Sequence, residues 1–145
     1  MTLFYNDGIL KRANFVKKIM QKIDTTVRII WGLHYAVFGL NKFLFFLPVN
    51  ASNDFAQKVI DSFYETGYLM QFVGLFQVIS GLMLLFNRYL NLAILIALPV
   101  SFNILTYTIF TANFGIQSVT SAAIVIGANI YFVIRRRKEY SHLFN

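Results

Sequence analysis

The chain has 145 residues, of which 57% are hydrophobic and 13% charged, with a mean hydropathy of +0.60 and a net charge of +7. A soluble domain of this size carries about 25% charged residues, so the composition indicates a membrane protein. Cysteine is absent, which excludes disulfides, thiolate nucleophiles, persulfide carriers and cysteine-ligated zinc or iron–sulfur centres.

The positive charge is concentrated at the two ends of the chain. Basic residues precede the first apolar segment and follow the last one: Lys11, Arg12, Lys17, Lys18, Lys22 and Arg28, then Arg135, Arg136, Arg137 and Lys138. Such clusters beside membrane spans follow the positive-inside rule, and anionic lipid head groups are a sufficient partner for them. We therefore expect the lipid bilayer, and no nucleic acid, as the partner of these charges.

Residues 1–26 form a basic segment with apolar positions three or four residues apart. This spacing predicts an amphipathic helix on the inner membrane face, with a mobile tail as the alternative. The apolar positions are Ile9, Ala13, Val16, Ile19, Met20 and Ile23.

Four apolar segments follow, at residues 27–48, 68–86, 90–111 and 116–134. A helix of about 20 residues crosses a hydrocarbon core of about 30 Å, and the second and third segments contain no charged residue. Only Asn87-Arg88-Tyr89 separates these two, so their helices must be antiparallel neighbours. The sequence predicts an all-α membrane protein: an antiparallel four-helix transmembrane bundle over residues 27–134, followed by a basic tail over residues 135–145.

The connection from residue 50 to residue 66 predicts a short external helix between the first two spans. Asn53 or Asp54 can cap it, and it carries one apolar stripe made of Phe55, Val59, Ile60 and Phe63. Its net negative charge places it outside, with the basic ends inside. Both termini are therefore expected in the cytoplasm.

Glycine recurs at every seventh position of the second span, at Gly67, Gly74 and Gly81. Small residues let helix backbones approach closely in lipid, where no hydrophobic force drives helices together. We expect these three glycines to form a helix-packing seam.

Polar side chains inside the spans are costly, so each is a candidate functional group. His34 and Asn129 lie at similar depth, which predicts a hydrogen bond between them, with a proton relay or a quinone contact as the alternative for His34. Six further residues gather in the outer half of the bundle and predict a polar cavity, although hydrogen bonds between helices would also explain them: Lys42, Gln71, Gln77, Asn103, Thr106 and Tyr107.

No catalytic or metal-binding pattern accompanies these residues. The only histidines are His34 and His142, and His142 falls in the basic tail. Paired histidines within the membrane are therefore lacking for haem, and neither a Ser–His–Asp arrangement nor a phosphate-binding glycine loop is present. We expect no metal site and no stand-alone enzyme.

Several stretches together resemble the DoxX family of bacterial four-helix inner-membrane proteins. The resemblance covers residues 28–134 and rests on Gly39-Leu40-Asn41-Lys42-Phe43, Gly67-Tyr68-Leu69, Ser80-Gly81-Leu82, Asn87-Arg88-Tyr89, Leu98-Pro99-Val100 and Asn103-Ile104-Leu105. One departure matters: members of that family often have a histidine shortly after the third-span asparagine, where this chain has Tyr107-Thr108.

The resemblance implies a multi-pass protein of the bacterial inner membrane. The family includes a subunit of thiosulfate:quinone oxidoreductase and membrane partners of thiol-oxidative-stress complexes. The expected function is the membrane subunit of a redox complex that contacts quinone, alongside a partner subunit or further copies of itself. Because cysteine is absent, any sulfur chemistry would belong to the partner. The alternatives are a non-enzymatic scaffold and a small transporter or lipid-binding bundle.

Overall fold

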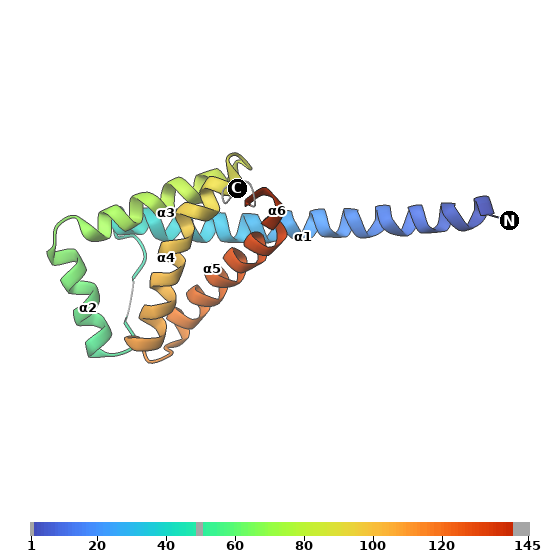
Figure 1. Cartoon of the computed structure of the whole chain (residues 1–145). Coiled ribbons are helices and arrows are strands. Elements are labelled where there is room, and N and C mark those ends of the chain that lie inside the picture. The colour runs from blue at the N-terminus through green and yellow to red at the C-terminus, as the bar shows by residue number, and fades with distance from the viewer. Residues whose placement is uncertain (1, 49–50, 141–145) are drawn as a thin grey trace.

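A computed structural model describes residues 2–48 and 51–140. These residues form helices and no strand, which confirms the all-α expectation (Figure 1). The helices are α1 (Thr2–Leu44), α2 (Asp54–Glu65), α3 (Leu69–Leu85), α4 (Leu90–Phe110), α5 (Ile116–Arg135) and the short α6 (Arg137–Tyr140).

The first helix differs from the sequence expectation. One continuous helix, α1, runs through the boundary expected between residues 26 and 27, and its 43 residues, Thr2–Leu44, reach about 65 Å. Its first half projects away from the other helices in Figure 1. The helix ends at Leu44, not at Pro48, because Phe45 adopts a left-handed backbone conformation and the Asn41 side chain binds both backbone groups of Leu47.

Four helices pack in ring order: α1 against α3, α3 against α4, α4 against α5, and α5 back against α1. By length and apolar composition α4 and α5 can each cross a membrane, and α2 with α3, bent by 90°, passes the same test as a pair. The structure thus bears out a helical membrane protein. That the bundle has four membrane spans stays a prediction. Helix α3 has only 17 residues, and the C-terminal half of α1 carries Arg28, His34 and Lys42.

The contact between α1 and α3 depends on glycines of both helices. A Cβ on Gly81 would lie 2.7 Å from the backbone nitrogen of Ala36, and one on Gly74 would lie 2.9 Å from the carbonyl oxygen of Gly39. On α1, a Cβ on Gly39 would lie 2.9 Å from the Gly74 carbonyl oxygen, and one on Gly32 would lie 3.1 Å from the Gly81 carbonyl oxygen. The two helices therefore touch backbone to backbone, as small residues permit.

Gly67 does not belong to this seam, which corrects the sequence prediction. It lies in the turn before α3, where its φ of +75° is left-handed, and a Cβ there would meet nothing within 4 Å. Gly67 thus serves the sharp bend between α2 and α3, a conformation that glycine adopts without steric cost.

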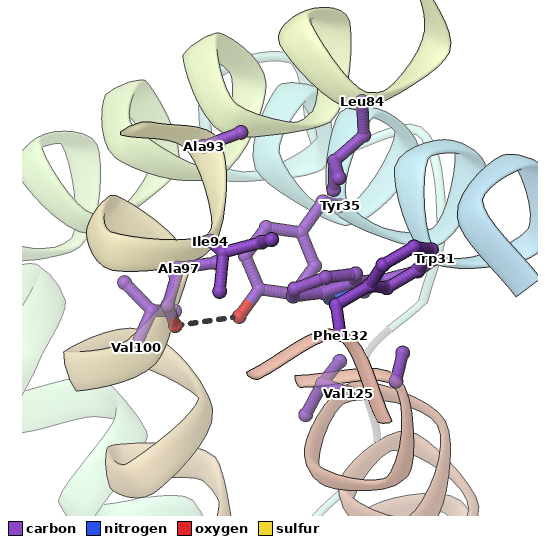
Figure 2. Close-up of a cluster of buried hydrophobic side chains, with 10 residues drawn as sticks. Trp31, Tyr35, Leu84, Ala93, Ile94, Ala97, Val100, Val125 and Phe132 are labelled. Atoms are coloured by element: carbon purple, nitrogen blue, oxygen red, sulfur yellow. Dashed lines mark hydrogen bonds between the residues drawn. The ribbon is translucent and has the colours of Figure 1, made fainter. Parts of the chain in front are cut away.

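Aromatic side chains of α1 and α5 form the centre of the core (Figure 2). The Trp31 ring stacks on Phe132, with centroids 6.0 Å apart, and meets the Tyr35 ring edge-on at 5.8 Å. Ile94, Val125 and smaller residues of α4 and α5 fill the space around them. The Tyr35 hydroxyl donates to the Ala97 carbonyl of α4 at 3.1 Å, as the dashed line shows.

Polar contacts close the end of the bundle next to the projecting part of α1. Arg28 donates to the carbonyl oxygens of Leu84 and Leu85, and so satisfies the C-terminal end of α3. Arg136 bonds Asn91 and Glu139 at 2.6 and 2.7 Å. Hydrogen bonds from Asn91 and Arg136 hold the pKa of the exposed Glu139 carboxyl below its usual value. These bonds attach Arg136 and Glu139 to Asn91 at the start of α4.

Candidate functional site

A cavity of about 410 Å³ lies at the opposite end of the bundle, between the C-terminal half of α1, α2, α3, α4 and α5. This volume falls in the range of about 300–1,000 Å³ that is typical of small-molecule sites. Most of the wall is apolar, with side chains such as Val73, Val100 and Ile104. A few polar side chains interrupt this lining, an arrangement that suits an amphiphilic ligand.

The α1 wall presents two nitrogen-bearing side chains one helical turn from Phe38. His34, Phe38 and Lys42 are four residues apart, so they share one helix face, and all three line the cavity. The His34 ring lies 4.5 Å from the Phe38 ring. Lys42 Nζ donates to the Phe38 carbonyl at 3.4 Å, which is long for a hydrogen bond and uses one of its three donors.

The α3 wall contributes Gln77, whose side chain is 2% exposed. Its amide oxygen has no hydrogen-bond partner. A buried acceptor without a partner costs about 1–3 kcal/mol, so the native fold retains an unfavourable group at this position. A ligand hydroxyl that donates to this oxygen would remove the cost.

The walls from α4 and α5 add amide and hydroxyl groups. Asn103 and Tyr107 line the cavity one turn apart on α4, and Gln117, Ser118 and Ser121 line it from the first turns of α5. Side chains with donors or acceptors therefore line the cavity from four helices, α1, α3, α4 and α5.

Helix α2 crosses the end of the bundle between the start of α3 and the α4–α5 turn (Figure 1), and its Ile60 and Phe63 line the cavity. Ser52 donates to the Ala112 carbonyl, and Asn53 Nδ2 donates to the Thr111 carbonyl at 3.1 Å. Asn53 Oδ1 also accepts from the backbone nitrogen of Ala56 and so caps α2, as the sequence predicts. One asparagine thus both starts α2 and attaches it to the α4–α5 turn.

Asn53→Asp is expected to release α2 without unfolding it. A carboxylate still caps the helix but cannot donate to the Thr111 carbonyl. Hydrogen–deuterium exchange at residues 54–65 should become faster than in the wild type, whereas exchange in α4 and α5 stays the same. Asn53→Ala, which removes the cap as well, should give still faster exchange. Unchanged exchange in Asn53→Asp would show that this attachment does not hold α2.

The structure brings together four of the six side chains predicted for a polar cavity: Lys42, Gln77, Asn103 and Tyr107. The other two lie outside its lining. Thr106 turns back to the Phe102 and Asn103 carbonyls of its own helix, and Gln71 has a buried amide oxygen without a partner elsewhere on α3. Ile60 and Phe63 are lining residues that the sequence placed on a helix but not at this site, because only the packing of α2 brings them there.

The predicted His34–Asn129 hydrogen bond is replaced by a different pairing. Asn129 is 4% exposed and donates to Ser101 Oγ at 3.2 Å, and the Ser101 hydroxyl in turn bonds the Tyr35 hydroxyl at 2.7 Å. His34 instead faces the cavity beside Phe38. The prediction used only the depth of the two residues in the membrane. Depth does not determine the direction in which each side chain points around its helix axis, so it could not predict this contact.

The chain shows no match to any protein-family model, curated protein or solved structure. The resemblance to the DoxX family therefore stays a prediction from the residues themselves. Across residues 2–48 and 51–140, no group of histidine, aspartate or glutamate side chains could hold a metal ion. His142 lies outside the described residues. The side chains that line the cavity can bind a ligand by hydrogen bonds, charge and apolar contact.

Proposed function

We propose that this protein is the membrane subunit of a redox complex and binds a lipid-soluble quinone in the cavity. In this proposal the apolar half of α1 and the helices α3, α4 and α5 span the bacterial inner membrane, with both termini in the cytoplasm. The ring packing of these helices and the basic residues at both ends of the chain support this arrangement.

The observation that carries the proposal is that hydrogen-bond donors, and a glutamine whose buried oxygen has no partner, line one mostly apolar cavity. Lys42 and His34 can donate to a quinone carbonyl, and the unpaired Gln77 oxygen can accept from a quinol hydroxyl. A site that must hold both forms needs both kinds of group. The apolar lining from Val73, Val100 and neighbouring residues suits the ring and the beginning of an isoprenoid chain.

Electrons would come from a partner subunit. The chain has no cysteine, and its resemblance to the DoxX family implies subunits that work in complexes. The contribution of this chain is then to bind the quinone ring, to orient it and to exclude water from it.

The test is mass spectrometry of the quinones and lipids that remain bound after gentle purification in detergent. The wild type should retain quinone in about stoichiometric amount, and Lys42→Ala and Asn103→Ala should lose most of it. Absence of quinone from a folded wild-type protein, reconstituted with added quinone, would refute the proposed function.

Gln77→Leu separates binding from folding. Removing a buried acceptor that has no partner should leave the melting temperature unchanged or raise it, while quinone retention falls several-fold. Gln71→Leu is the matched control, because Gln71 also has a buried oxygen without a partner but does not line the cavity. A large fall in the melting temperature of Gln77→Leu alone would assign Gln77 to helix packing.

A scaffold is the second candidate, and the projecting half of α1 favours it. Phe15, Val16, Ile19 and Ile23 are exposed there, alongside basic side chains such as Lys17, Lys18 and Lys22. A folded protein that binds no quinone but associates with a cytoplasmic partner through residues 12–23 would favour this candidate.

A further inference from the structure

We propose that the cavity selects ligands with a negatively charged head, and that Lys42 is the residue responsible for this selection. The inference rests on the proposed function in that it uses the same cavity. It goes further by stating the charge of the preferred ligand: an amphiphile with an ionised group at the end that meets Lys42.

The first argument is that no acidic side chain that the structure describes in residues 12–48 and 51–140 pairs with Lys42. The chain has six acidic residues. Asp24 pairs with Arg135, and Glu139 pairs with Arg136, both at the far end of the bundle. The remaining four are Asp7, Asp54, Asp61 and Glu65.

The three acidic residues on α2 do not compensate Lys42 either. Asp54, Asp61 and Glu65 are exposed on α2, and none of them lines the cavity. Asp7 belongs to the same helix as Lys42 but lies about 50 Å away along its axis. Among the described side chains none therefore balances this ammonium group, which leaves that role to the head group of a ligand.

The second argument is the surroundings of the ammonium group. Lys42 lines a cavity whose wall is mostly apolar and includes Phe38, Phe63 and Met70, and the polar side chains of that wall carry no negative charge. Its one hydrogen bond, to the Phe38 carbonyl, leaves two donors for a ligand. A cation in apolar surroundings is unfavourable unless it is paired, so an anion gains more here than it would at an exposed lysine.

The test uses two quinones of nearly equal size that differ in charge. At neutral pH 2-hydroxy-1,4-naphthoquinone is an anion, whereas 2-methyl-1,4-naphthoquinone is neutral. Because the chain has no cysteine, neither quinone can form a thiol adduct. Calorimetric titration of the full chain in detergent gives a Kd for each, and the ratio of the two Kd values measures the charge preference. Comparing this ratio between variants cancels the partition of each probe into the micelle.

The wild type should bind the anion on the order of tenfold more tightly than the neutral quinone, as expected for a close charge pair in a partly desolvated site. Lys42→Met should abolish this preference, and Lys42→Gln should do the same if the methionine variant does not fold. Lys58→Met, which removes an exposed lysine of α2, should leave the preference unchanged.

Equal affinity of the wild type for the two probes, or a preference that survives both Lys42 variants, would overturn the inference while leaving quinone binding in place. If neither probe binds the folded wild type, the proposed function fails together with it. The two failures are therefore distinguishable in one experiment.

Discussion

Gly81→Leu is expected to lower the free energy of unfolding by about 3 kcal/mol, the upper end of the usual cost of overpacking, because a new side chain at this position meets backbone atoms. A Cβ on Gly81 would already lie 2.7 Å from the Ala36 nitrogen and 2.9 Å from the Gly32 oxygen. Backbone cannot move aside as a flexible side chain can, so α1 and α3 must separate. Thermal unfolding in detergent, followed by circular dichroism, measures the loss.

Gly127→Leu is the matched control for this prediction. Gly127 is an exposed glycine inside α5, where a Cβ would meet nothing within 4 Å. The same substitution there should be neutral or stabilise by up to about 1 kcal/mol, since glycine is unfavourable inside a helix. Equal melting temperatures for Gly81→Leu and Gly127→Leu would refute the close contact between α1 and α3.

Ser101→Ala is expected to cost about 2 kcal/mol, because it removes the hydroxyl through which Asn129 of α5 and Tyr35 of α1 are joined. Asn129 would keep a buried amide nitrogen without a partner among the described residues. Tyr35 would retain only its bond to the Ala97 carbonyl. Chemical or thermal unfolding in detergent measures the change.

Thr106→Val controls for the loss of a hydroxyl on the same helix. The Thr106 hydroxyl bonds only carbonyls of its own helix, at Phe102 and Asn103. Its removal should change the free energy of unfolding by no more than about 0.5 kcal/mol, as for most surface substitutions. If Ser101→Ala were as mild as Thr106→Val, the link through Ser101 would not contribute to holding α1, α4 and α5 together.

Helix positions were predictable because local patterns determine them. Long runs without charge predicted α3, α4 and α5 to within one residue at each end. The Asn53 cap and the apolar stripe predicted α2. The extent of α1 was not predictable in this way, because the amphipathic segment and the apolar segment meet between residues 26 and 27 without a glycine or proline to separate them.

Contacts between helices required the structure. The sequence indicated a glycine seam on the second span, yet it did not reveal that Gly32 and Gly39 form the other side or that Gly67 belongs to a turn. Likewise the pairing of Asn129 with Ser101 depends on how α5 is rotated against α4. Successive side chains of a helix differ in direction by about 100°, so a small rotation of the helix about its axis changes which side chains face a neighbouring helix and which face lipid. The amino-acid composition of the helix does not determine that rotation.

By itself the sequence determined the helical membrane class, the order of the helices, the basic ends and the set of polar residues available for a site. Charge and apolar periodicity can be read from short stretches of sequence. Because a charged group in lipid is costly, these two properties determine which segments can form membrane helices. Only the tertiary structure decided which of those polar residues share a cavity. Lys42, Gln77 and Asn103 line one cavity because α1 packs against α3 and α2 is attached to the α4–α5 turn. Gln71 and Thr106 lie outside this cavity.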